Sequence, residues 1–156
     1  MLTWKQLQLE HKEWAATRYQ GYLPELPLAG IIGEAGEAQH ALLSEYKECM
    51  YGHNPRHTNH NEAFLDALAD CAIYAISWMN SLGLDIEDVN WDAPVRLPEK
   101  ALDLGYELVR QACKCWEFIA VTWPFLALLN AACKSRGRDL LEVTNEAWTE
   151  VKGRVR

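Results

Sequence analysis

Two pairs of carboxylates each lie in an otherwise apolar stretch of the chain. Glu34 and Glu37 are three residues apart in AGIIGEAGEAQHALL. Asp66 and Asp70 are four residues apart in EAFLDALADCAIYAISWMNSL. On a helix, each spacing places the two acids on one face. Carboxylates in apolar surroundings are costly unless they are paired or bind a cation, and no Lys or Arg lies within a helical turn of the two glutamates. The pattern therefore indicates a cation site.

If the two acid-bearing helices pack antiparallel, all four carboxylates come together. A set of ligands made of oxygen atoms only favours Mg²⁺, with Mn²⁺ as the alternative ion. Such ions bind the phosphates of nucleotides and keep several waters, one of which is a candidate nucleophile. The alternative interpretation is that each acid pair lies on the solvated face of a surface helix. It fits less well because Ala, Ile, Cys and Tyr surround the acids.

Two other clusters suggest different metals. Glu37-x-x-His40 matches half of a di-iron carboxylate signature, but no second Glu-x-x-His occurs on the proposed helix pair or downstream of it. A second cluster has spacings that suit zinc and consists of Cys49, His53, His57 and His60. Most of it lies in the Gly-, Pro- and Asn-containing segment 51–61, for which a polar loop is the favoured interpretation, and such a loop is also suited to close over a substrate.

The elements that must position these residues are helical. Apolar periodicity predicts an all-α bundle of about five or six helices, with no competing strand pattern. We expect Thr3, Asn61 and Thr122 to cap helix N-termini, and Gly83 to end the third helix. The predicted helices cover 3–20, 27–49, 61–82, 98–120, 123–137 and 139–154.

The length of 156 residues, 49% of them hydrophobic, predicts one domain over 1–156. Within it, SLGLDIEDV resembles SRGRDLLEV, which suggests a degenerate helical-hairpin repeat over 27–90 and 98–156. The alternative is that Gly followed by Asp is common helix punctuation. In the repeat register Asp70 aligns with Pro124, so the second copy has lost the acids.

Charge and cysteine content narrow the partners and the compartment. A net charge of −7 argues against a nucleic-acid partner, and a phosphate substrate would need a metal to reverse the local sign. Five unevenly spaced cysteines, mostly in apolar helical runs, indicate reduced core residues of a cytoplasmic protein. The N-terminus lacks the pattern of a signal peptide, and no apolar run is long enough to span a membrane. We therefore expect a soluble protein with no membrane partner.

The segments GEAGEAQHAL and DALADCAIYAISWMNSLGLD resemble the MazG-like all-α nucleoside triphosphate pyrophosphohydrolases, of the superfamily that includes dimeric dUTPases and phosphoribosyl-ATP pyrophosphohydrolases. The hallmark of this family is Glu-x-x-Glu on one helix and Glu-x-x-Asp on the next. Glu34 and Glu37 match the first pair, and Asp70 matches the last acid. The remaining family position falls on Ala67, so Asp66 is the candidate replacement.

The resemblance implies a Mg²⁺-dependent hydrolase that converts a nucleoside triphosphate to the monophosphate and pyrophosphate, and that assembles as a homodimer or higher homo-oligomer. Glu34, Glu37, Asp66 and Asp70 would hold the metal, and Glu37 or Asp66 would orient the water. For substrate binding we expect Lys47, Asn80, Lys152 and Arg154. The alternative for the three cations is that they are exposed and complement helix dipoles. The alternative function is a non-catalytic helical nucleotide- or protein-binding module with an incomplete metal site.

Overall fold

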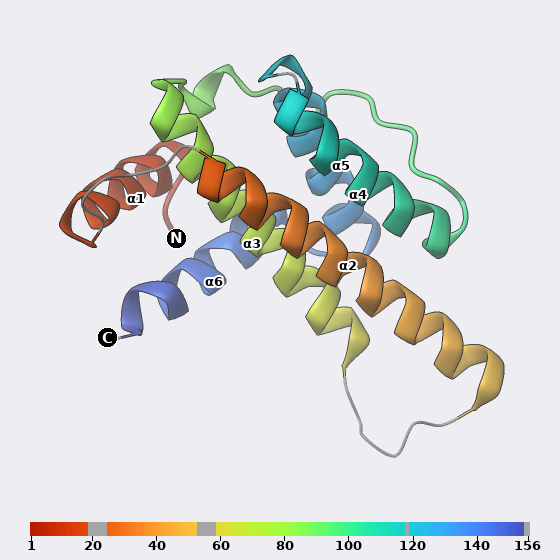
Figure 1. Cartoon of the computed structure of the whole chain (residues 1–156). Coiled ribbons are helices and arrows are strands. Elements are labelled where there is room, and N and C mark those ends of the chain that lie inside the picture. Colours follow the sequence, from red (N-terminus) through yellow and green to blue (C-terminus); the bar gives the residue numbers. More distant parts are fainter. Residues whose placement is uncertain (19–24, 53–58, 118, 155–156) are drawn as a thin grey trace.

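The computed structural model describes residues 1–18, 25–52, 59–117 and 119–154. In these ranges the protein is all-helical and has no strand, which confirms the predicted all-α bundle (Figure 1). Two short 3₁₀ helices, η1 (Ile86–Asp88) and η2 (Ile119–Val121), lie between longer elements. The six α-helices of the described ranges are α1 (Trp4–Arg18), α2 (Glu25–Tyr51), α3 (His60–Leu82), α4 (Ala101–Glu117), α5 (Thr122–Ser135) and α6 (Leu140–Gly153).

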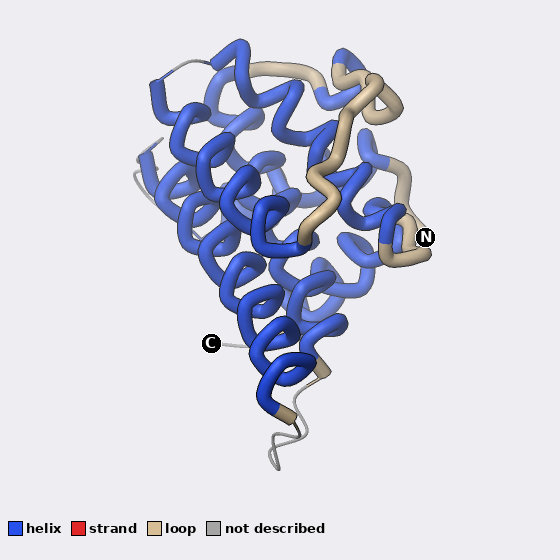
Figure 2. Tube along the Cα trace, turned by 90° about the vertical axis from the view of Figure 1, so that its right-hand side faces the viewer, coloured by secondary structure: helices blue, strands red, loops and turns tan. Residues whose placement is uncertain are grey.

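Helix α2 is the long central element, and α3 returns antiparallel beside it (Figure 1). Two glycines allow close helix packing. A Cβ added at Gly30 would lie 2.4 Å from the Tyr74 ring on α3. A Cβ added at Gly105 of α4 would lie 3.2 Å from the Cα atom of Gln39 on α2. Glycine at these two positions therefore lets both neighbouring helices approach α2 closely, and Figure 2 shows the resulting bundle from the side.

The ends of the helices follow local side-chain chemistry. The backbone N–H of Thr3 donates to Gln6 Oε1 at 2.8 Å, and the N–H of Gln6 donates back to the Thr3 hydroxyl at 3.3 Å. This reciprocal pair is a capping box, and it confirms the predicted start of the first helix. Gly83 ends α3 with a φ of 67°, a left-handed conformation that favours glycine, so this prediction is also confirmed.

Two predicted caps are wrong. Asn59, not Asn61, caps α3, because its side chain accepts a hydrogen bond from the backbone N–H of Glu62 at 3.2 Å. Starting the helix at Asn59 also places Glu62 in the first turn, where an acid favours the helix dipole. Thr122 is the first residue of α5 and not its cap, because η2 leads directly into that helix.

Buried apolar side chains from all six helices form one continuous cluster in the described structure. Its largest fully buried members include Leu42, Phe64, Phe125 and Trp148. Within the described ranges, no helix has both the length and the apolar character needed to cross a membrane. All five cysteines are free, but the prediction that they are core residues is wrong for Cys49 and Cys113, which are exposed; Cys71, Cys115 and Cys133 are buried.

Candidate functional site

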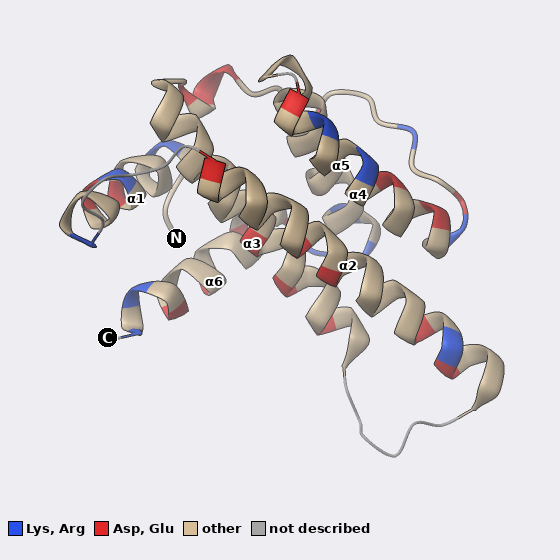
Figure 3. Cartoon of the chain, viewed as in Figure 1, with Lys and Arg blue, Asp and Glu red and all other residues tan. Residues whose placement is uncertain are grey.

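The four predicted acids lie on neighbouring faces of the two longest helices. Glu34 and Glu37 come from α2, and Asp66 and Asp70 come from α3. Glu34 and Asp70 are half-buried, whereas Glu37 and Asp66 are exposed. Figure 3 shows acidic positions on both helices of this pair. The two helices thus carry a row of carboxylates from the edge of the core to the surface.

The half-buried acids are influenced electrostatically by the other carboxylates. Burial, together with the charges of Asp70, Glu37 and Asp66, raises the pKa of Glu34 to about 7. Burial and the charge of Asp66 are the main causes that raise the pKa of Asp70 to about 6. A carboxyl group with such a pKa is in an environment that disfavours its charged form. A bound cation would reverse this preference.

The end of α6 brings two charged residues, Glu150 and Arg154, near Asp66 of α3. Burial and the charge of Glu150 raise the pKa of Asp66, while the charge of Arg154 opposes this rise. Arg154 Nη2 lies 4.0 Å from Glu150 Oε2, one turn away on the same helix end. Arg154 was predicted to bind substrate, and the structure brings it to the acids of α3. Glu150 was missed because its position depends on how α6 packs against α3, about 80 residues away along the chain.

The donor set is suited to a hard divalent cation, because all four predicted ligands are carboxylates. In the described part of the chain, however, no three His, Cys, Asp or Glu side chains gather closely enough to hold a metal ion together. Binding an ion would therefore require rotation of these side chains. Ala67, on which the resemblance to the MazG-like enzymes places an acid, is only 3% exposed and belongs to the core. The candidate replacement, Asp66, lies at the surface.

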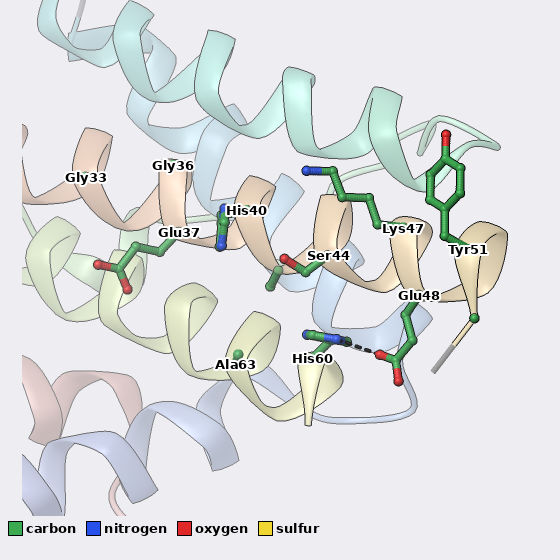
Figure 4. Close-up of a pocket in the computed structure, with 12 residues that line it drawn as sticks. Gly33, Gly36, Glu37, His40, Ser44, Lys47, Glu48, Tyr51, His60 and Ala63 are labelled. Atoms are coloured by element: carbon green, nitrogen blue, oxygen red, sulfur yellow. Dashed lines mark ion pairs between the residues drawn. The ribbon is translucent and has the colours of Figure 1, made fainter. Parts of the chain in front are cut away.

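A cavity of about 840 Å³ begins at Glu37 and follows the C-terminal half of α2 toward the start of α3 (Figure 4). Lys47, a predicted substrate-binding residue, lines it, and its side chain extends back along α2 toward His40 (Figure 4). At the same end of the cavity, His60 Nε2 of α3 lies 2.7 Å from Glu48 Oε2 of α2. The full lining consists of Gly33, Gly36, Glu37, His40, Ala41, Ser44, Lys47, Glu48, Tyr51, Gly52, His60 and Ala63.

Two helical glycines in the cavity lining are not required by packing. A Cβ added at Gly33 or Gly36 would meet no atom within 4 Å, unlike one added at Gly30. Neither has a positive φ. A glycine inside a helix costs about 1 kcal/mol relative to alanine, so these two positions weaken α2 without a structural benefit.

Two other predicted substrate-binding residues have different partners. Asn80 Nδ2 donates to the Gln8 carbonyl oxygen at 3.2 Å and lies 3.4 Å from His11 Nδ1, joining α3 to α1. Lys152 Nζ forms an ion pair with Glu10 Oε2 at 2.7 Å. Neither Asn80 nor Lys152 lines the cavity beside Glu37. The structure therefore does not bring these two side chains together with Lys47.

The structure describes the Glu37-x-x-His40 pair and part of the proposed zinc cluster. His40 lines the cavity one turn after Glu37. In the zinc cluster, His53 and His57 lie outside the described residues, Cys49 is exposed, and His60 pairs with Glu48.

Comparison with known proteins identifies no relative of this chain. No protein-family model matches the chain, and no curated protein or solved structure matches it.

Proposed function

We propose that the protein is a divalent-metal-dependent nucleoside triphosphate pyrophosphohydrolase, which releases pyrophosphate and a nucleoside monophosphate. The observation that carries this proposal is that four carboxylates lie on neighbouring faces of α2 and α3, where burial and their mutual repulsion raise the pKa of Glu34 and Asp70. The resemblance of the two acid-bearing segments to MazG-like enzymes gives the same expectation. The adjoining cavity supplies space for an organic substrate.

Glu34, Glu37, Asp66 and Asp70 would hold Mg²⁺ or Mn²⁺. A metal bound there would neutralise the carboxylates, polarise a phosphate oxygen and lower the pKa of a water molecule. The exposed acids Glu37 and Asp66 are the two candidates to accept a proton from the attacking water and orient it.

Positive side chains would receive the phosphate oxygens. Arg154 approaches the acids of α3 from the end of α6, whereas Lys47 lines the cavity farther along α2, ten residues after Glu37. Both can form charge-assisted hydrogen bonds, and they partly offset the repulsion between phosphates and carboxylates. Asn80 and Lys152 would first have to leave Gln8 and Glu10, so we give them the weaker role.

The test is pyrophosphate release from each of the common ribo- and deoxyribonucleoside triphosphates, with Mg²⁺ or Mn²⁺. We expect release by the wild-type protein and its loss in Glu37→Gln. Glu25→Gln is the matched control, because Glu25 is an exposed acid at the start of the same helix. Absence of release from every nucleotide contradicts the enzyme proposal, and full activity of Glu37→Gln contradicts the site.

A non-catalytic nucleotide- or protein-binding module is the second candidate. It is favoured by buried Ala67 in place of a family acid, and by the absence of a gathered metal-binding triad among the described side chains. Calorimetry with a non-hydrolysable nucleotide and Mg²⁺ separates the two functions. Tight binding without turnover of the natural nucleotide supports the module.

The resemblance also leads us to propose a homodimer or higher homo-oligomer. Light scattering at micromolar concentration should give at least twice the mass of one chain. A monomer mass at all concentrations contradicts this assembly.

A further inference from the structure

The cavity beside the carboxylates has two distinct ends. At one end, Glu37 both lines the cavity and acts electrostatically on Glu34 and Asp70. From there the cavity follows α2 past His40 and Ser44 to Lys47. Glu37 and Lys47 are separated by ten residues of helix, or about 15 Å along its axis. The space is therefore continuous with the acid cluster but extends well beyond it.

The charges along this path are sparse. Glu48, next to Lys47 on α2, is already paired with His60 of α3 at 2.7 Å. His40 and Ser44, between the acid end and Lys47, offer hydrogen-bonding groups on one side of α2. Such a lining suits an uncharged polar group that is attached to a charged one bound at Glu37.

At the end of the cavity near the acids, two lining residues are glycines, which contribute backbone atoms and no side chain to the cavity floor. Gly33 and Gly36 are the two lining residues nearest Glu37 on its N-terminal side, and a side chain at either would enter open space. Helix packing does not require glycine there, in contrast to Gly30, whose Cβ would collide with Tyr74. Close approach of a ligand to the helix backbone is a reason to keep a glycine that the fold does not need.

We propose that this cavity binds the nucleoside moiety of the substrate while its phosphates lie at the acid cluster, and that Gly33 and Gly36 keep the floor open for it. This inference rests on the proposed pyrophosphohydrolase function. It makes the two glycines specificity-determining positions, because a side chain there fills the space next to Glu37 through which a nucleoside attached to bound phosphates must enter the cavity, whereas free pyrophosphate does not need that space.

The test compares Gly33→Leu with Ala29→Leu, an exposed position one turn earlier on α2 that lies outside the cavity lining. Two competitive inhibitors are measured: pyrophosphate, and the monophosphate of the nucleotide that is hydrolysed fastest. We expect Gly33→Leu to raise the inhibition constant of the monophosphate on the order of tenfold. The inhibition constant of pyrophosphate should not rise, and the thermal midpoint of the variant should not fall. Ala29→Leu should leave both constants unchanged.

Unchanged inhibition by the monophosphate in Gly33→Leu overturns the inference, as does a parallel loss of both inhibitors. A change in mass by light scattering without a change in either constant also overturns it, since the floor would then pack against a second copy. If the wild-type protein releases no pyrophosphate, the proposed function fails. Calorimetry with the common nucleoside monophosphates then tests separately whether the cavity binds a nucleoside. Binding lost in Gly33→Leu but kept in Ala29→Leu supports the cavity, and any other pattern overturns it.

Discussion

Glu34 on α2 and Glu107 on α4 lie in opposite electrostatic environments. Glu107 on α4 accepts two hydrogen bonds from the Arg110 guanidinium, at 2.6 and 2.8 Å, and a third from Gln111 at 2.7 Å. The Arg110 contact lowers the pKa of Glu107. Glu34 on α2 has other carboxylates around it, and its pKa is raised to about 7. Helix α5 carries no acid at all.

This difference separates acids whose charged form stabilises the folded state from acids whose charged form destabilises it. A carboxylate held by an arginine, like Glu107, is favourable in its charged form. A half-buried carboxylate among like charges, like Glu34 or Asp70, is unfavourable unless a cation arrives. We interpret the repulsion among Glu34, Asp70 and their acidic neighbours as the mark of a binding site, because Glu107 shows that this fold can place an acid beside a cation.

The largest expected effect is on catalysis. Glu37→Gln should lower pyrophosphate release by on the order of 100-fold or more, because it removes a carboxylate from the proposed metal shell. Glu107→Gln should leave activity within about twofold, because its interactions stay within α4. Steady-state kinetics with saturating Mg²⁺ measures both. Equal losses in the two variants would remove the distinction between the acids of α2/α3 and Glu107.

Mg²⁺ should stabilise the protein through α2/α3 alone. An ion that binds only the folded state adds about 2.7 kcal/mol at a concentration 100 times its dissociation constant. We therefore expect the thermal midpoint of the wild-type protein to rise with added Mg²⁺, and to rise less in Asp70→Asn. Glu107→Gln should keep the full rise. The same rise in all three proteins, measured by calorimetry, would place the ion elsewhere.

Two glycines on the same helix should respond in opposite directions. Gly30→Ala places a methyl group against the Tyr74 ring and should lower the free energy of unfolding by about 1–3 kcal/mol. Gly33→Ala enters open space and should raise it by up to about 1 kcal/mol. Urea denaturation measures both values. A loss of stability in Gly33→Ala would mean that packing, and not a ligand, requires that glycine.

The smallest expected effect is a pH dependence in the absence of metal. The pKa of Glu34 is higher in the folded protein, at about 7, than its ordinary value of 4.5. The folded state therefore binds the proton more tightly, and the stability from this group is present below pH 4.5 and lost as pH rises through 7. Glu34→Gln should remove this part of the decline. Urea denaturation with a chelator between pH 4.5 and 8 tests it.

In Glu107→Gln the change should have the opposite sign. The pKa of Glu107 is lowered in the folded state, so its contribution is present at neutral pH and lost on acidification. If the free energy of unfolding changed with pH in the same way in both variants, the contrast between Glu34 and Glu107 would be contradicted.

The sequence alone predicted the helices and the pairing of acids on each helix face. These features depend on short-range periodicity and on caps such as Thr3 and Gly83, whose partners lie within a few residues. Even so, the choice between Asn59 and Asn61 as the cap of α3 could not be read from residue type, because both residues are good caps.

Tertiary structure decided what surrounds the acids. The raised pKa of Glu34, the arrival of Glu150 and Arg154 from α6, and the engagement of Asn80 with α1 all depend on contacts between distant parts of the chain. The open floor at Gly33 likewise becomes visible only when the neighbours of α2 are in place. Helix periodicity fixes which side chains share a face, but burial and charge proximity depend on which faces meet, and long-range packing determines that.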